Sequence, residues 1–173
     1  SELRKRGGGL FGSNPLTGSI GVVTLNLPRL AYESTNRDEF RQKVATYAAL
    51  AKESLEIKRS LIEKETVRGM YPFSARYLNG VKQREGSYWA NHFSTIGVVG
   101  MNEACRNLLG TDLTTQEGQT FALETLAELR TQIAHFQTET GFYYNLEATP
   151  AEGTSYRLAR IDKKFHPDIL TAG

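Results

Sequence analysis

The segment from Asn145 to Arg157 (NLEATPAEGTSYR) holds the residues of this chain best suited to bind and act on a polar ligand. A short apolar run ends at Pro150, crosses Gly153 and continues as a polar segment, which predicts a strand, a tight turn and a helix start. Backbone N–H groups at a helix start have no partners within the helix and carry the positive end of its dipole. They favour a phosphate or a carboxylate, so the segment predicts an anion site.

The side chains of this segment divide into groups that would hold the ligand and groups that would act on it. The predicted binding groups are backbone N–H groups and hydroxyls of Thr149, Ala151, Gly153, Thr154 and Ser155. Two carboxylates among them, Glu147 and Glu152, are candidates for acid–base work or hydrogen bonding at the ligand. An ordinary helix cap with solvated glutamates would leave the same pattern, so that alternative stays open.

Composition excludes several classes of protein. The chain has 173 residues, 39% hydrophobic and 23% charged, which suits a single domain with one sizeable core. Its net charge of +2 is too small to indicate a nucleic-acid partner. No run approaches the roughly 20 apolar residues of a membrane helix, and the N-terminus lacks an apolar signal segment. One cysteine, Cys105, rules out an internal disulfide, and we expect a cytoplasmic protein that binds no membrane.

Hydrophobic patterning predicts strands that alternate with helices, the signature of an α/β fold with parallel strands. A glycine-rich loop is expected over residues 1–17, and alternating strands and helices over 18–173. The predicted strands are Ser19 to Leu27, Phe93 to Gly100 and Phe142 to Thr149.

Three helices are predicted between these strands. A capping box of Asn36 and Glu39 opens a long amphipathic helix that ends before Gly69. A short helix runs through Asn107 to a turn at Gly110, and a third helix runs from Thr115 to a C-cap at Gly141. The stretch from Tyr71 to Trp89, broken by proline and glycine, is predicted to be irregular.

Two of the predicted strands repeat one another. Ile20 to Asn26 (IGVVTLN) and Ile96 to Asn102 (IGVVGMN) match at five of seven positions, and both would end in asparagine. Because ligands bind beyond the carboxyl ends of parallel strands, Asn26, Asn102 and Glu147 are predicted to share one rim of the sheet. The simpler alternative is that valine-rich strands resemble each other by composition.

Four separated blocks carry a resemblance to a known family. They are GLFGSNPLTGSIGVVTLNLPRL (9–30), ESLEIKR (53–59), HFSTIGVVGMNEA (92–104) and YNLEATPAEGTSYRLARIDKK (144–164). With them the chain resembles the catalytic barrel of the anaerobic, class III ribonucleoside-triphosphate reductases, which are glycyl-radical enzymes. The resemblance implies part of a ten-stranded α/β barrel that binds a ribonucleoside triphosphate, with Asn14 of the FGSNP turn near the substrate.

The resemblance also implies groups that lie outside this chain. In the family a glycyl radical generates a thiyl radical on a barrel cysteine, which abstracts the ribose 3′ hydrogen so that the 2′ hydroxyl leaves as water. That cysteine is expected just before Ser1, so the chain is interpreted as a fragment, inactive alone. A formate or thiol reductant, zinc, an ATP effector, a radical-SAM activating enzyme and a homodimer are likewise implied. No metal site is predicted within the chain.

Cys105 is not taken as the radical residue, because it falls inside the predicted MNEACRN helix, where a lone cysteine is usually a core residue. His92 opens a strand and could donate a proton, but no second ligand stands at metal-binding spacing. Two alternatives to the reductase remain: a non-catalytic nucleotide-binding α/β module, and another glycyl-radical enzyme.

Overall fold

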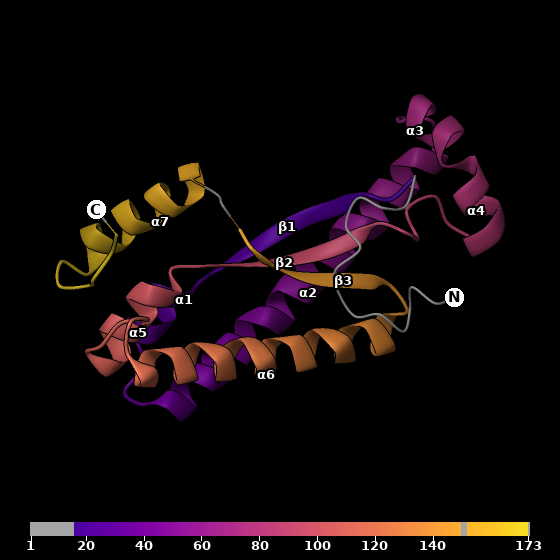
Figure 1. Cartoon of the computed structure of the whole chain (residues 1–173). Helices are drawn as coiled ribbons and strands as arrows, with labels where there is room; N and C mark the ends of the chain where they lie inside the picture. Colours follow the sequence, from indigo (N-terminus) through magenta and orange to yellow (C-terminus); the bar gives the residue numbers. More distant parts are fainter. Residues whose placement is uncertain (1–15, 150–151, 173) are drawn as a thin grey trace. The chain divides into compact units, whose positions relative to one another are not determined.

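The computed structural model describes residues 16–149 and 152–172, with Glu152 described by its backbone alone. Its elements, in chain order (Figure 1), are β1 (Ser19–Asn26), α1 (Leu27–Tyr32), α2 (Arg37–Val67), α3 (Pro72–Tyr77), α4 (Asn79–Glu85), β2 (Phe93–Val99), α5 (Met101–Leu109), α6 (Gln116–Thr140), β3 (Tyr143–Ala148) and α7 (Glu152–Phe165). Residues 1–15 of the predicted glycine-rich loop, and the predicted turn at Pro150 and Ala151, lie outside the described residues.

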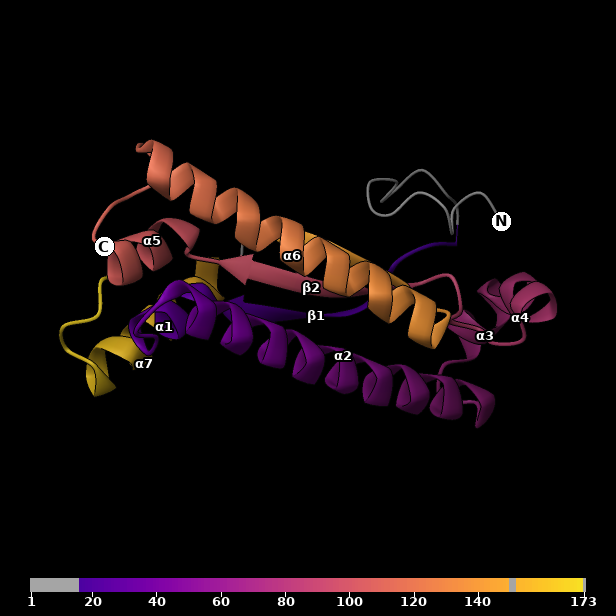
Figure 2. The ribbon, with the colours of Figure 1, turned by 90° about the horizontal axis from the view of Figure 1, so that it is seen from below.

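The three strands form one sheet in the order β1-β2-β3. Helices connect each strand to the next, and the arrowheads of β1 and β2 point the same way (Figure 2), as parallel pairing requires. The predicted α/β class is therefore confirmed, as is the placement of the three strands in one sheet. The ten-stranded barrel remains a prediction, since the described residues contribute three strands.

The chain divides into two compact units. The first comprises Ser1–Val23, Leu50–Ile96 and Ile133–Leu146, and the second comprises Thr24–Ala49, Gly97–Gln132 and Glu147–Gly173. The carboxyl ends of all three strands belong to the second unit. Ligand sites in parallel sheets lie at these ends, so the second unit is where a site is sought.

The first unit is organised around a buried arginine of α2, Arg59. Its guanidinium donates to the carbonyl oxygens of Trp89 at 2.7 Å and His92 at 2.9 Å, and lies 4.3 Å from the ring centre of Phe142. Burial lowers the pKa of Arg59, and burial, with the nearby Arg59 charge, lowers the pKa of His92 to about 4. His92 is thus uncharged at neutral pH, and Arg59 holds the segment that leads into β2.

The start of α2 follows the predicted capping box with one change. Asn36 Oδ1 accepts the backbone N–H of Glu39 at 2.9 Å, as expected. The Glu39 carboxylate accepts the N–H of Thr35 at 2.7 Å instead of returning to Asn36. Its pKa falls to about 2, chiefly through the hydrogen bond from Lys43.

The prediction of an irregular stretch from Tyr71 to Trp89 is wrong, because it contains α3 and α4. Pro72 stands in the first turn of α3, where a missing N–H costs no hydrogen bond. Gly86 closes α4 in the left-handed conformation, at φ +85°. The residues interpreted as breakers are therefore the ends of helices.

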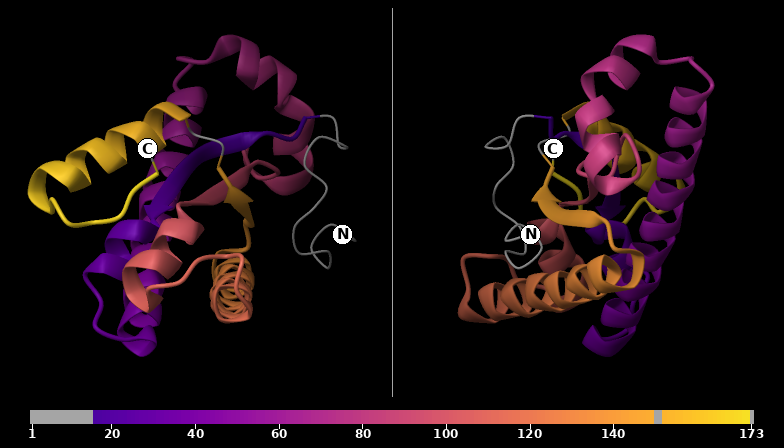
Figure 3. Two further views of the ribbon diagram at one scale, coloured as in Figure 1. Left: turned by 60° about the vertical axis from the view of Figure 1, so that its left-hand side comes forward. Right: turned by 90° about the vertical axis from the view of Figure 1, so that its right-hand side faces the viewer.

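The prediction that both repeated segments are strands ending in asparagine is also wrong. β1 ends at Asn26 and the chain turns directly into α1, whereas Asn102 is the second residue of α5. Gly100 ends β2 at φ +73°, and a Cβ there would lie 2.3 Å from Pro28 Cγ. This glycine lets α1 pack against α5, as Figures 2 and 3 show.

Among the residues that the structure describes, no helix combines the length and apolarity needed to cross a bilayer.

Candidate functional site

A cavity of about 330 Å³ lies in the second unit, at the carboxyl ends of β1 and β2. Its walls come from the end of β1, the junction of β2 with α5, and α7, and include Asn26, Gly100, Glu103, Ser155 and Asp162. Asn26 and Ser155, predicted from separate parts of the sequence, therefore line one cavity.

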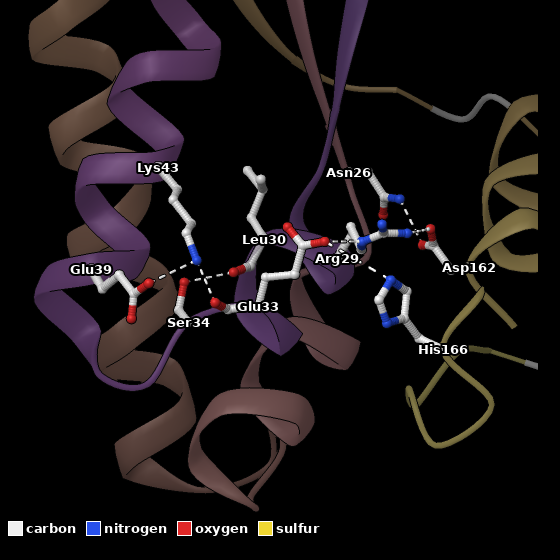
Figure 4. A network of polar contacts seen from close by, with 9 residues as sticks. All are labelled: Asn26, Arg29, Leu30, Glu33, Ser34, Glu39, Lys43, Asp162 and His166. Carbon is white, nitrogen blue, oxygen red and sulfur yellow. Dashed lines mark hydrogen bonds and ion pairs between the residues drawn. The ribbon is translucent and has the colours of Figure 1, made fainter.

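Asp162 of α7 takes part in a network of polar contacts beside this cavity (Figure 4). Asp162 is 3% exposed and accepts hydrogen bonds from Asn26 Nδ2 at 2.7 Å and from Arg29 Nη1 at 3.0 Å. Arg29 also pairs with Glu33, whose Oε1 lies 4.0 Å from His166 Nε2. The hydrogen bond with Glu33, followed by that with Asp162, raises the pKa of Arg29. This network joins α7 to the segment that follows β1.

Asn102 has a different role from Asn26. Its Oδ1 accepts the backbone N–H of Leu113 at 3.2 Å, and its Nδ2 lies 3.4 Å from Glu103 Oε1. Asn102 is not among the residues that line this cavity. Its side chain holds the loop between α5 and α6, so a substrate contact by Asn102 stays a sequence prediction.

Thr149 and Glu147 share one face of the third strand. The N–H of Thr149 donates to the Val98 carbonyl oxygen at 3.3 Å, which extends the pairing one residue beyond β3. Because side chains alternate along a strand, Glu147 and Thr149 lie on the same face. Thr149 Oγ1 is buried and has no hydrogen-bond partner among the described residues. The Thr149 hydroxyl is therefore a buried polar group without a hydrogen bond in the described structure, and its contact with a substrate stays a prediction.

The first turn of α7 contains Gly153, Thr154 and Ser155. Gly153 was predicted in a tight turn before the helix, but it is the second helical residue and has no positive φ. It is exposed, and a Cβ there would meet nothing within 4 Å. Packing does not require this glycine, so close approach of a ligand remains the reason we propose for it.

The structure does not test the predictions for three residues. Asn14 and Ala151 lie outside the described residues, and Glu152 begins α7 with a side chain that is not described. Their roles stay predictions.

Sequence reasoning missed Asp162 and Arg29. Both fall within blocks that carry the family resemblance, LPRL and ARIDKK, and their opposite charges were a possible signal. Their pairing could not be recognised from the sequence because 133 residues separate them.

Cys105 is fully buried in α5, and its Sγ lies 3.7 Å from the Gly118 carbonyl oxygen. Burial raises the pKa of the thiol, so the reactive thiolate is disfavoured. In the described part of the chain, no group of three or more His, Cys, Asp or Glu side chains could hold a metal ion.

The absence of a side chain at Gly97 leaves room for Thr149 on this face of the sheet. A Cβ at Gly97 would lie 2.0 Å from Thr149 Oγ1 and 2.9 Å from Thr24 Oγ1. We expect Gly97→Ala to displace Thr149 and to lower the free energy of unfolding by about 1–3 kcal/mol, the usual cost of overpacking. Urea titration and a crystal structure of the variant measure both effects.

Gly21 is the matched control, since it holds the equivalent position in the other repeated segment. The three atoms nearest to a Cβ there all belong to the Lys58 side chain, whose flexible end can move aside. Gly21→Ala should therefore cost less than Gly97→Ala. Equal costs, with Thr149 unmoved, would contradict this account.

Comparison with known proteins gives the family. The family model described as anaerobic ribonucleoside-triphosphate reductase matches residues 1–173. The chain is 29% identical over 162 residues to the anaerobic ribonucleoside-triphosphate reductase of Haemophilus influenzae, covering 85% of this chain and 22% of the relative. The reductase of Enterobacteria phage T4 is 24% identical over 164 residues, covering 87% and 25%.

The comparison with solved structures points to the same family. The anaerobic ribonucleotide reductase from Thermotoga maritima with citrate in the active site has a TM-score of 0.76 and 29% identity, covering 91% of this chain and 29% of that chain. The same enzyme in complex with dATP and CTP also gives 0.76 and 29%, covering 94% and 27%. This chain spans about a quarter of the length of these relatives. Because the family model covers the whole chain, the chain belongs to the anaerobic ribonucleoside-triphosphate reductase family.

Proposed function

We propose that this chain forms part of the substrate site of an anaerobic ribonucleoside-triphosphate reductase, which converts ribonucleoside triphosphates to deoxyribonucleoside triphosphates by radical chemistry. The observation that carries the proposal is the family match over residues 1–173. The solved relative in complex with dATP and CTP supports a nucleotide as the ligand class.

Residues of the cavity, together with predicted site residues that do not line it, supply binding and orientation. The N–H groups in the first turn of α7 bind the phosphates, assisted by the hydroxyls of Thr154 and Ser155. Asn26 and Thr149 orient the nucleotide. Glu147 acts on the ribose as a proton acceptor or hydrogen-bond partner, with Glu152 as the competing candidate. Asn14, Ala151 and Asn102 complete the proposed substrate contacts.

The radical groups of the family do not fit the residues described. Cys105 is buried with a raised pKa, and the described residues contain no metal-binding cluster. We assign the hydrogen-abstracting thiol, glycyl radical, reductant site, zinc and ATP effector to other parts of a longer protein. We further propose that this protein is a cytoplasmic homodimer served by a radical-SAM activating enzyme, and that the 173 residues alone are inactive.

Replacing Gly153 tests the phosphate site. Gly153→Val places a branched side chain in the first turn of α7, where no described residue obstructs it. Hydrogen bonds to charged groups are worth about 1.5–3 kcal/mol. Losing one should weaken triphosphate binding to the full-length protein about 10- to 100-fold, measured by calorimetry.

The control is Gly80→Val, at the equivalent second residue of α4, where a Cβ meets only Arg84 Nη1 at 3.6 Å. Its affinity should match that of the wild type. Unchanged affinity in Gly153→Val would show that the phosphates do not bind at this turn.

Glu147→Gln tests the chemistry separately from binding. The substitution removes a charge and a proton acceptor while keeping the shape, so triphosphate affinity should stay unchanged. Turnover of the activated full-length enzyme should fall about 10²- to 10⁴-fold, the usual worth of a general acid or base.

Glu152→Gln is the parallel variant. Full turnover in Glu147→Gln with turnover lost in Glu152→Gln would transfer the role to Glu152. If both variants kept full turnover, neither carboxylate would act in the reaction.

A further inference from the structure

Asn26 has an unusual side-chain contact for its position. It is the N-cap residue of α1, where asparagine commonly accepts a backbone N–H of the first turn. Here it makes no side-chain cap hydrogen bond. Its amide instead donates to Asp162 of α7, 136 residues away, at 2.7 Å. The side chain is therefore oriented by α7 and not by its own helix.

This contact fixes which end of the amide faces the ligand. An ionised carboxylate can only accept hydrogen bonds, so the Asn26 nitrogen must face Asp162. Figure 4 shows the nitrogen directed at Asp162 and the oxygen directed away. Arg29 Nη1 donates to the other Asp162 oxygen at 3.0 Å, so both oxygens of this buried carboxylate accept hydrogen bonds. Because Nδ2 donates to Asp162, Oδ1 is the end of the Asn26 amide that can accept a hydrogen bond from a ligand in the cavity that Asn26 lines.

The ligand group that this oxygen would meet follows from the cavity. Asn26 lines it together with Ser155, which belongs to the first turn of α7, where we place the phosphates. The ribose is the part of a nucleotide that adjoins the phosphates, and its hydroxyls are hydrogen-bond donors. A carbonyl oxygen accepts from a hydroxyl, whereas an amide NH₂ offers only donors.

We propose that Asp162 is a positioning residue that holds the Asn26 amide with its oxygen toward a ribose hydroxyl of the bound nucleotide. The inference rests on the proposed function, because it takes a ribonucleoside triphosphate as the ligand. Asp162 acts through Asn26 and does not itself touch the substrate.

The test compares nucleotides that have the hydroxyl with nucleotides that lack it. Cytidine triphosphate is the probe, and its 2′-deoxy and 3′-deoxy analogues compete with it for the full-length protein. The wild type should bind one analogue about 3- to 10-fold more weakly than the ribonucleotide, the usual range for one hydrogen bond. The measured quantity is the ratio of these dissociation constants, since general damage to the fold weakens all three nucleotides alike.

Asp162→Asn frees the Asn26 amide to rotate, and Asn26→Leu removes the acceptor. Each variant should bring the ratio close to one, and the double variant should show no further change, because both act through one hydrogen bond. The exchange Asn26→Asp with Asp162→Asn restores an acceptor that is held by a donor at 162. It should recover the wild-type ratio.

Glu124→Gln is the control for losing an ion pair. It removes an exposed contact of similar length, Arg41 Nη2 to Glu124 Oε2 at 2.8 Å, between α2 and α6 in the second unit. Its ratio should equal that of the wild type.

Each alternative outcome is distinct. A wild type that binds no cytidine triphosphate would overturn both the proposed function and this inference. A wild type with the expected ratio, kept in Asp162→Asn, would overturn the inference alone. If Asp162→Asn does not fold, Asn26→Leu and the exchanged pair decide: an unchanged ratio in Asn26→Leu, or a ratio near one in the exchanged pair, contradicts the role of Asp162.

Discussion

The buried carboxylate of Asp162 is the interaction on which the geometry of the candidate site depends. An ionised group with 3% exposure is tolerated only when its charge is compensated and its oxygens accept hydrogen bonds. Arg29 and Asn26 meet both needs, and both belong to the segment that ends β1 and begins α1. A shift of α7 away from this segment would leave a charge buried without a partner, so the helix is held at the end of β1.

Two glycines let the surrounding elements approach this arrangement. Gly97 leaves space for Thr149 beside β2, and Gly100 accepts both a left-handed backbone and the ring of Pro28. In both cases the neighbour is closer than a side chain would permit. Parallel strands whose carboxyl ends meet at one edge, together with these two close contacts, bring a helix start, an amide and hydroxyl groups into one compact unit.

The sequence was sufficient for features that depend on local patterns. Apolar runs placed β1, β2 and β3 within one residue of their observed ends, and caps at Asn36, Thr115 and Gly141 marked the long helices. The sequence was not sufficient where a proline or glycine can either interrupt a helix or mark its end. Pro72 and Gly86 looked like breaks and are helix ends. Pro28 is the second residue of the six-residue α1, which is too short to show periodicity.

The candidate site could be predicted only in part, for the same physical reason. Helix-start chemistry pointed to Gly153, Thr154 and Ser155 because those residues are adjacent in the chain. The contact between Asp162 and Asn26 depends on tertiary packing, which no local pattern records. Asn102 shows that a local match can also mislead. It matches Asn26 in the repeated segments, but β2 ends before Gly100, so Asn102 lies in a helix.

The central claim is that a nucleotide lies between the end of β1 and the start of α7. A crystal structure of the unsubstituted full-length protein with bound cytidine triphosphate tests it most directly. We expect phosphate oxygens at about 2.7–3.2 Å from backbone nitrogens in the first turn of α7, and a ribose hydroxyl at a similar distance from Asn26 Oδ1. A bound substrate whose phosphates contact other elements, with the first turn of α7 open to solvent, would contradict the account.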